Sequence, residues 1–392
     1  MDLGLLYEFD VPQPWAGDHP WGQRMAERQV YRDCIEQIVL ADKYDFETVW
    51  CVEHHFRENR SHMPCNEAVL GALSQITKNI RLGFGVTLTP HEFIHPARVA
   101  EKVATVDLLS RGRVEWGLGR STPMEQTAFG VDRARSKDKQ RAAAKTVVGM
   151  WQEQYYEEHS EFLEFPKRMV TPKPYQYPHP PVWMAANAEE GARLAGQDGL
   201  GVLLFSTMQP LSKLAGIIQA YREGQAQMKP LTGVITNKIG TYTLVHCAES
   251  RFEFEQNRLW DSMWWWYKNL AEFMLDWEFA HLPKEQQEAV FPLVSARARG
   301  EFDITEFDRE DMVIVGTPDE CVEKFLRYDE AGVDQVLCFV NFGYLPQDAV
   351  MRCIELLGSY VIPELKKRGA HRSAGSIAAS IESIQKAPKT HN

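Results

Sequence analysis

Residues 48–56 read Thr-Val-Trp-Cys-Val-Glu-His-His-Phe, an apolar and β-branched run followed directly by a polar box. A short apolar run of this kind predicts a buried strand, which we expect to end at Val52. The Glu-His-His-Phe box at 53–56 therefore follows the carboxyl end of the strand. Active sites of folds with parallel strands lie at such ends, so the box is the first candidate for a functional site.

Strands and amphipathic segments continue to alternate on both sides of this stretch. The strands that we expect lie at 3–7, 48–52, 80–87, 114–118, 182–186, 201–205, 241–246 and 335–340. The clearest helical segments lie at 28–43, 66–77, 95–109 and 136–156. This alternation is typical of βα units, so eight strands predict an α/β fold, a single (β/α)8 barrel. The Pro-rich crossing at 166–181 should run extended, because proline cannot continue a helix or a central strand.

The chain is long enough for one large domain with an insertion. Its 392 residues exceed the roughly 250 of an ordinary barrel of this class, which tolerates insertions. We expect the barrel domain at 1–368, with a helical, aromatic-rich insertion at about 250–310 after the seventh strand, because one strand–helix connection is rarely so long. Residues 369–392 are rich in Ala, Ser and Lys with little periodicity, which predicts a flexible C-terminal tail.

Composition and charge narrow the class of function. Hydrophobic residues make up 44% and charged residues 25%, as in ordinary soluble proteins. Because we find neither a membrane-length apolar stretch nor a signal peptide, we expect a cytoplasmic protein without a membrane contact. The net charge of −11 and the lack of a basic stripe argue against nucleic acid as a partner. The seven cysteines form no Cys-x-x-Cys pair, so we expect neither a disulfide framework nor a zinc site.

Four stretches that are distant in the sequence meet at one rim if the strands form a barrel. They are the box at 53–56, the glycine-rich segment 83–89, residues 117–120 and residues 185–191. Glycine allows backbone to approach a flat ring or a phosphate where a Cβ would clash. Arg120 offers a charged fork for a phosphate, and backbone amides at a helix start after the fifth strand could add to it. The rim is therefore a candidate cofactor site.

Each of these signals also has a purely structural interpretation. His54 is the candidate proton-transfer group, because imidazole titrates near neutrality, but adjacent histidines after a strand are often hydrogen-bonded structure. Arg120 could instead close an ion pair with Glu115. Neighbouring residues on a strand point in opposite directions, so His54 and His55 do not suit one metal ion, and we expect no metal site.

These residues carry a resemblance to a known family. The matching stretches are Thr-Val-Trp at 48–50, the box at 53–56, Thr-Lys-Asn-Ile-Arg-Leu-Gly at 77–83, His-Pro at 95–96, Leu-Leu-Ser-Arg-Gly-Arg at 108–113 and Phe-Gly-Val-Asp at 129–132. Together they resemble the bacterial luciferase-like monooxygenases, densely over 48–132 and in outline over 1–365. That family uses reduced FMN (FMNH2), usually supplied by a separate flavin reductase, and O2, and a C4a-hydroperoxide then oxygenates a small-molecule organic substrate. The resemblance implies this activity, and a homodimer, for the present chain.

The resemblance also implies roles for single residues. His54 matches the family's catalytic histidine, and His55 would be its supporting neighbour. Arg120 matches a phosphate-contacting arginine, and Lys137 lies close to another basic position. The other cofactor contacts that we expect are Glu53, Gly85, Val86, Asn187, Ala188 and Glu189. The bond between Gly85 and Val86 falls where the family often has a non-proline cis peptide behind the flavin ring.

Two departures from the family pattern bear on the reaction. Gly119 stands where the catalytic subunit of luciferase has a reactive cysteine, and Asn187-Ala188 stands where it has Glu-Ser near the phosphate, so we do not expect light emission from a long-chain aldehyde. Two alternatives remain open. One is a deazaflavin-dependent oxidoreductase on the same barrel, against which the box at 53–56 argues. The other is a non-catalytic luciferase-like partner subunit, against which the retention of His54 and Arg120 argues.

The insertion contains a cluster of aromatic residues. An apolar stripe at helical spacing is formed by Trp260, Met263, Trp264, Tyr267, Ala271 and Met274, and core packing explains it most simply. Trp265 and Trp266 lie off this stripe, so something should cover them. Because the family carries its mobile lid in this connection, we expect Trp264, Trp265 and Trp266 to roof the substrate site or to line a dimer contact. An aromatic roof would favour an apolar or aromatic substrate.

Overall fold

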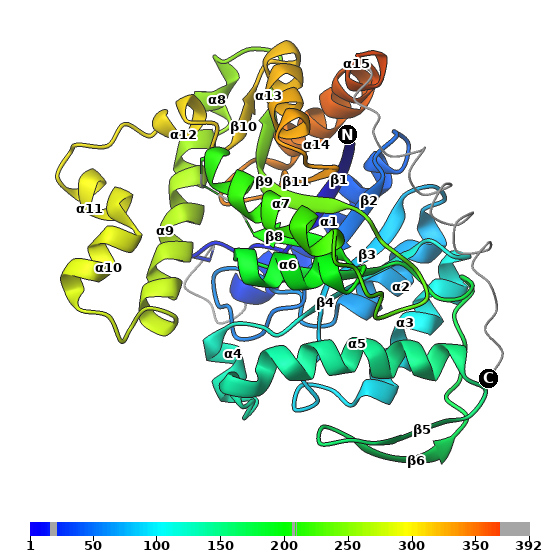
Figure 1. The fold of residues 1–392 in the computed structure, drawn as a ribbon. Coiled ribbons are helices and arrows are strands. Elements are labelled where there is room, and N and C mark those ends of the chain that lie inside the picture. Colours follow the sequence, from blue (N-terminus) through cyan, green and yellow to red (C-terminus); the bar gives the residue numbers. More distant parts are fainter. Residues whose placement is uncertain (16–21, 206–207, 209, 369–392) are drawn as a thin grey trace.

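A closed barrel of parallel strands forms the centre of the computed structural model, which describes residues 1–15, 22–205, 208 and 210–368 (Figure 1). The barrel strands are β1 (Asp2–Tyr7), β2 (Thr48–Cys51), β3 (Arg81–Leu88), β4 (Val114–Gly119), β7 (Val182–Ala186), β8 (Gly201–Phe205), β9 (Ile239–Cys247) and β11 (Gln335–Phe339). Neighbouring strands pair in parallel in the order β9-β11-β1-β2-β3-β4-β7-β8, and pairing of β8 with β9 closes the ring. The predicted (β/α)8 barrel is thus confirmed.

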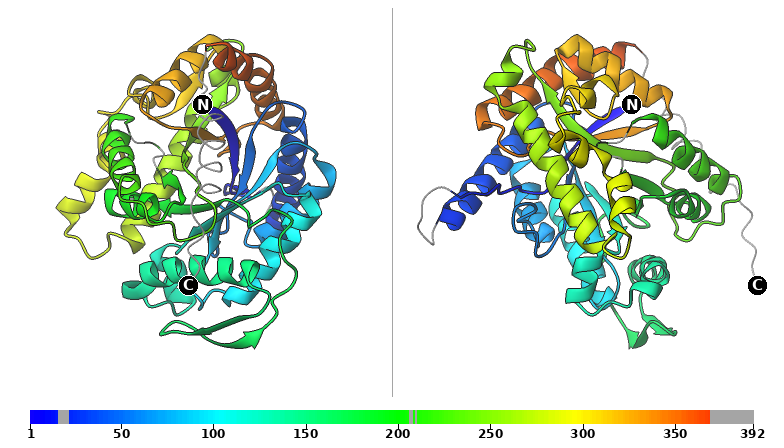
Figure 2. Two further views of the ribbon diagram at one scale, coloured as in Figure 1. Left: turned by 45° about the vertical axis from the view of Figure 1, so that its right-hand side comes forward. Right: turned by 90° about the vertical axis from the view of Figure 1, so that its left-hand side faces the viewer.

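Helices surround the barrel on its outer side (Figure 2). The α-helices outside the insertion are α1 (Gly22–Ala41), α2 (Asn66–Ile76), α3 (Pro96–Ser110), α4 (Pro123–Ala128), α5 (Ser136–Gln152), α6 (Glu189–Gln197), α7 (Ser212–Gln225), α13 (Pro318–Glu330), α14 (Gln347–Leu356) and α15 (Ile362–Lys367). Local sequence sets their ends, as α3 illustrates. His95 caps its start by accepting a hydrogen bond from the Ala97 amide, Pro96 fits the first turn, and Gly112 supplies a positive φ just after its end.

Two connections differ from the sequence-based expectation. The helix that we expected to reach residue 156 ends at Gln152, and β5 (Tyr156–His159) and β6 (Glu164–Arg168) form an antiparallel hairpin that ends at the start of the proline-rich crossing. Pro166 is tolerated there because it lies in an irregular stretch of a two-stranded sheet. A short strand, β10 (Ile314–Gly316), also pairs with the end of β9. It was not expected, because three residues are too few to show a periodic pattern.

Two tryptophans fill the amino-terminal half of the barrel interior. Trp50 lies over Gly83 and Trp183 lies over Gly201, where an added Cβ would fall 2.4 Å and 2.5 Å from the respective ring. The two rings meet edge to face with centroids 5.4 Å apart. Because this half is packed, space for a ligand remains only toward the carboxyl ends of the strands.

The insertion between β9 and β10 is helical, as the sequence predicts. It contains α8 (Glu253–Gln256), α9 (Leu259–Trp277), α10 (Lys284–Val290), α11 (Pro292–Ala298) and α12 (Glu306–Arg309). Helices α10 and α11 extend away from the barrel on the left of Figure 1. Across the ranges that the structure describes, no helix has the length and apolar character needed to cross a membrane. The predicted tail at 369–392 lies outside the described residues.

Candidate active site

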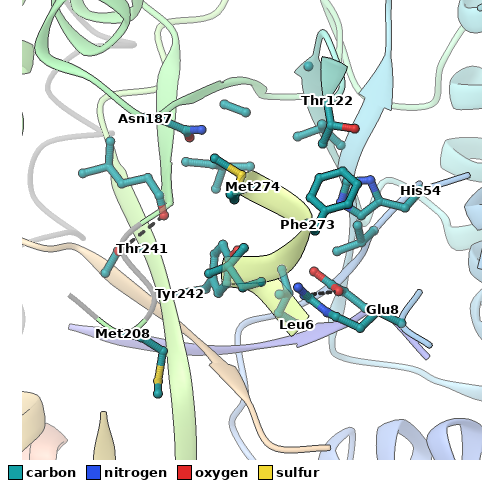
Figure 3. A pocket seen from close by; sticks show the side chains of 18 of the residues that line it. Leu6, Glu8, His54, Thr122, Asn187, Met208, Thr241, Tyr242, Phe273 and Met274 are labelled. Atoms are coloured by element: carbon teal, nitrogen blue, oxygen red, sulfur yellow. Dashed lines mark hydrogen bonds and ion pairs between the residues drawn. The ribbon is translucent and has the colours of Figure 1, made fainter. Parts of the chain in front are cut away.

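A cavity of about 660 Å³ lies at the carboxyl ends of the barrel strands. Its volume is within the roughly 300–1,000 Å³ typical of sites for small molecules and cofactors. Side chains of the barrel strands, such as Leu6 and Thr241, line it, whereas Phe273 and Met274 of α9 contribute from the insertion (Figure 3). The box at 53–56 and the ends of β3, β4 and β7 all contribute to this one cavity, as the sequence predicts for the rim.

His54 lines the cavity and is held by a buried carboxylate. Its Nδ1 lies 3.1 Å from Oε1 of Glu125, whose side chain is fully buried. The same carboxylate accepts hydrogen bonds from the backbone N–H of His55 at 2.6 Å and from the hydroxyls of Ser121 and Thr122, each at 2.6 Å. Burial alone would raise the pKa of Glu125, but the charge of His54, its hydrogen bond and the two hydroxyls hold that pKa well below its usual range.

Glu125 is therefore a charged orienting group for the imidazole. An ionised carboxylate on Nδ1 fixes the orientation of the ring, while Nε2 remains available. Proton donation or acceptance at Nε2 is thus the chemistry that this pair supports. The structural interpretation of adjacent histidines applies instead to His55, whose ring packs edge to face on Phe129 with centroids 5.0 Å apart.

Sequence reasoning missed Glu125, although a local signal for it exists. Thr122-Pro123-Met124-Glu125 is a capping box, with Thr122 at the N-cap of α4 and Glu125 three residues later. That motif predicts a helix start but gives no sign of His54, which is 71 residues away in the chain. The same box recurs as Thr317 and Glu320 at the start of α13, and there the carboxylate pairs with Arg251.

Arg120 also lines the cavity, and its guanidinium carries a positive charge without a counter-ion among the described residues. Its guanidinium donates to the Ser136 hydroxyl at 3.3 Å, and no carboxylate of the described residues lies within ion-pair distance. The alternative pairing with Glu115 is wrong. Glu115 instead pairs with Arg81 at 2.5 Å and accepts a hydrogen bond from the indole of Trp183 at 2.7 Å.

The wall near Arg120 is formed by glycines and by Val86. The peptide bond between Gly85 and Val86 is cis, as the resemblance predicts, and both residues line the cavity. A Cβ on Gly119 would lie 2.3 Å from a methyl carbon of Val86. A cysteine at Gly119 would therefore not fit without displacement of Val86, which accounts for one departure from the luciferase pattern.

Only part of the expected phosphate site faces the cavity. Asn187 lines it, but Ala188 and Glu189 are exposed and do not contribute to its walls. Lys137 lies on the surface, where its ammonium pairs with Glu190 at 2.6 Å. The lysine that does line the cavity is Lys213 of α7, which sequence reasoning missed because it has no distinguishing motif.

Glu53 lines the cavity as a buried carboxylate. Its oxygens lie 3.6 Å from His55 Nε2 and 3.6 Å from Lys102 Nζ. His55 is not among the residues that line the cavity, so it supports the box rather than contacting a ligand there. Within the described residues, no group of histidine, cysteine or acidic side chains could hold a metal ion.

A buried charge cluster adjoins the box on the side of β1. Glu8 lines the cavity and makes a short ion pair with Arg60, and both side chains are almost fully buried. Burial would raise the pKa of Glu8, but the charges of Arg60 and His54 lower it below its usual value. Burial also raises the pKa of Asp10 to about 7, against the opposing effect of Arg60. Sequence reasoning identified none of these three residues.

The insertion covers the cavity, but with residues other than the three predicted tryptophans. Its contributions come from Tyr267, Leu270, Phe273, Met274, Phe279, Val290, Phe291, Pro292 and Leu293. Trp264, Trp265 and Trp266 are absent from these walls, so other residues of the insertion form the roof of this cavity, and a dimer contact at the three tryptophans stays a prediction. Trp266 is fully buried 6.0 Å from the ring of Phe339, Trp265 faces Tyr344, and Trp264 lies beside Phe302.

The buried face of α9 is also rotated relative to the predicted stripe. Met263, Tyr267 and Ala271 are buried as expected, but Trp260, Trp264 and Met274 are only half-buried. Trp265 and Trp266, which lie off the predicted stripe, belong to the buried face. Tyr344, after β11, lies against Trp265, and Phe339 of β11 lies against Trp266, so both side chains are covered, as we expected.

The comparisons with known proteins agree with this architecture. The family model described as luciferase-like monooxygenase matches residues 15–335. The chain is 25% identical over 366 residues, 91% of this chain and 96% of the relative, to the oxygenase component of a flavin-dependent trigonelline monooxygenase from Acinetobacter baylyi. It is 24% identical over 348 residues, 87% of this chain and 96% of the relative, to an F420-dependent glucose-6-phosphate dehydrogenase from Segniliparus rotundus. The crystal structure of the monooxygenase RslO1 from Streptomyces bottropensis superposes with a TM-score of 0.71 at 25% identity and covers 93% of this chain and 99% of that one.

Proposed function

Because the chain belongs to the luciferase-like monooxygenase family, we propose that it is a flavin-dependent monooxygenase that uses reduced FMN and O2 to oxygenate an apolar or aromatic organic substrate. The observation that carries this proposal is the His54–Glu125 pair, which faces a cavity closed by apolar side chains of the insertion. A separate flavin reductase would supply the reduced cofactor, since the relative from Acinetobacter baylyi is named an oxygenase component.

The residues around the cavity fit a flat ring that carries a phosphate. Gly85 and Gly119 leave one wall without large side chains, and Arg120 offers a guanidinium with no carboxylate partner among the described residues. Ser121 and Asn187 add hydrogen-bonding groups to the same cavity. Arg120 would hold the phosphate, because a guanidinium fork matches its oxygens. Bound reduced FMN would supply the electrons that activate O2.

The protein contributes proton handling and exclusion of water. Glu125 keeps the imidazole of His54 oriented, so His54 can deliver or accept a proton at Nε2 beside the reacting atoms. Phe273, Met274 and Phe291 cover the cavity with apolar surface. Water that entered an oxygenase site would divert reduced cofactor into unproductive reaction, so this cover supports the oxygenase proposal.

The two alternatives have less support. The F420-dependent relative supports the alternative of a deazaflavin-dependent oxidoreductase, but the substrate in the name of that relative is a sugar phosphate. The apolar cover formed by Phe273, Phe279 and Phe291 offers few hydrogen bonds to the hydroxyls of such a substrate. A non-catalytic partner subunit would have no need for the buried carboxylate that orients His54.

Anaerobic titration of the protein with reduced FMN, and separately with reduced F420, tests the cofactor. We expect FMN to bind more tightly, and Arg120→Ala to weaken it by at least about tenfold, because hydrogen bonds to a charged group contribute about 1.5–3 kcal/mol. Lys137→Ala is the matched control, since this lysine is exposed and pairs with Glu190 outside the cavity. Tight binding of F420 without binding of FMN would overturn the proposal.

A further inference from the structure

A second cation faces the cavity on the side of His54. Arg57 follows the box at 53–56 and lines the cavity, with its guanidinium carbon 3.7 Å from the centroid of the Phe273 ring on α9. Among the described residues its guanidinium makes no hydrogen bond and no ion pair with a carboxylate. A guanidinium that is stacked on an aromatic ring and open to a cavity is a common site for a planar anion.

Three acidic groups act on Arg57: Glu8 and Glu125 are engaged elsewhere, and burial raises the pKa of the third, Asp10, to about 7. Glu8 forms its short ion pair with Arg60, and Glu125 accepts from His54, from the His55 amide and from two hydroxyls. Burial, assisted by the nearby charge of Arg60, lowers the pKa of Arg57 to about 10, so it stays protonated at neutral pH. Burial and the nearby charge of Arg60 both destabilise the charged guanidinium of Arg57, and a bound anion would reduce this destabilisation.

We propose that Arg57 binds the carboxylate of the substrate, and that the substrate is an organic acid with an apolar, ring-containing body. The inference rests on the proposed function, because it assigns a substrate class to that same cavity. A carboxylate can accept two parallel hydrogen bonds from a guanidinium. The rest of the molecule would lie beside His54 and under Leu270, Phe273 and Met274, which offer only apolar contacts.

Arg57 and Arg120 can be assigned to different ligands. Arg57 follows β2 and stacks on the insertion, whereas Arg120 follows β4 and contacts Ser136 at the start of α5. The His54–Glu125 pair joins the segments that carry them. A phosphate on Arg120 and a carboxylate on Arg57 would therefore place a cofactor and a substrate in one cavity, with His54 available to both.

The test compares benzoate with benzamide, which has nearly the same shape but no charge, by calorimetry on the full-length protein with oxidised FMN present. We expect benzoate to bind more tightly to the wild type, and Arg57→Met to weaken benzoate by at least about tenfold with little effect on benzamide. Arg297→Met is the matched control, because Arg297 stacks on Trp264 with its guanidinium carbon 4.4 Å from the ring centroid, away from the cavity. Equal binding of the two probes to the wild type, or an equal loss of both in Arg57→Met, would overturn the proposal.

Two additions keep the outcomes separate. Arg57→Lys retains the charge and should bind benzoate with intermediate affinity, so the proposal stays testable if Arg57→Met fails to fold. The comparison of benzoate with benzamide on the wild type also tests the proposal without any variant. Repeating the titration without flavin distinguishes the two proposals: if FMN does not bind but benzoate binding still depends on Arg57, the proposed function fails and the substrate class stands.

Discussion

Replacement of Glu125 by glutamine should impair catalysis without removing a side chain from the site. The glutamine has the same shape, and its oxygen can still accept from His54 Nδ1 and the His55 amide while its NH2 group donates to the hydroxyls of Ser121 and Thr122. What the variant loses is the negative charge beside the imidazole and the long bond, 3.3 Å, from the Thr122 backbone N–H. The protonated form of His54 then has no counter-ion at this position.

The magnitude follows from the donors that this carboxylate satisfies. The four bonds that the glutamine keeps should each weaken by about 1 kcal/mol on loss of the charge, and relief from burying that charge offsets part of the loss, so we expect about 2 kcal/mol lower stability at neutral pH. Because the pKa of folded Glu125 is lowered, its stabilisation is present above the unfolded pKa of about 4.3 and is lost as the pH falls below it. The stability gap between wild type and variant should therefore narrow under acid conditions.

The assay separates chemistry from flavin binding. We expect single-turnover oxygenation by protein preloaded with reduced FMN to slow by about tenfold to a hundredfold, below the loss of about 10²- to 10⁴-fold that removal of a general acid–base group causes. The affinity for FMN should not change. Glu320→Gln is the matched control, since Glu320 occupies the same capping box in α13 but pairs with Arg251 far from His54.

Two results would refute this reasoning. Turnover at the wild-type rate in Glu125→Gln would mean that the carboxylate only caps α4. An equal loss of turnover in Glu125→Gln and Glu320→Gln would mean that both act through stability alone. Urea unfolding of each variant at neutral and acid pH provides the stability measurement that this comparison needs.

Three further variants probe other parts of the site. His54→Ala should abolish most oxygenation while FMN still binds, and full turnover in that variant would remove His54 from the mechanism. Asp10→Asn should stabilise the protein by up to about 4 kcal/mol at alkaline pH, because the pKa of Asp10 is raised to about 7 and the wild type therefore loses stability as the pH rises from about 4 to 7. Urea unfolding across this pH range would refute the reasoning if the difference in unfolding free energy between variant and wild type did not widen. Gly119→Ala should lower the free energy of unfolding by about 1–3 kcal/mol and weaken FMN binding, since the added Cβ would collide with Val86. An unchanged melting temperature would contradict this prediction.

Local signals account for what the sequence predicted of the fold. Each barrel strand is a short apolar run that can be recognised alone, and once the runs are counted the closed barrel follows from the rules for βα units. Elements without such a signal were missed. The hairpin at 156–168 contains charged residues and a proline, and Ile314–Gly316 is too short to show a period.

The face of α9 shows a different limit of sequence patterns. Aromatic and apolar residues occur almost all round this helix, so periodicity alone does not select the side that is buried. Trp266 is covered because Phe339 of β11 and the guanidinium of Arg60 lie against it, with the guanidinium carbon 4.3 Å from its ring centroid. Both contacts join segments far apart in the chain.

The site was predicted where its residues follow strands. His54 and Arg120 were proposed because position at a strand end is a property of the local sequence, whereas Gly85 was proposed from the family resemblance. Glu125 and Arg57 acquire their roles from partners on other elements, His54 and Phe273 respectively. Their local sequence predicts only a helix cap and an exposed arginine, so only the tertiary structure identifies them.

Oxygen transfer is the property that most directly distinguishes the proposed enzyme from its alternatives. The decisive measurement is to load the protein with reduced FMN, mix it with isotopically labelled O2 and a panel of ring-containing organic acids, and determine the label in the products by mass spectrometry. We expect labelled oxygen in at least one acid with wild-type protein, and far less with His54→Ala. Flavin reoxidation that yields only hydrogen peroxide across the panel, or turnover that requires F420 and proceeds without O2, would contradict the assignment of this chain as an FMN-dependent monooxygenase.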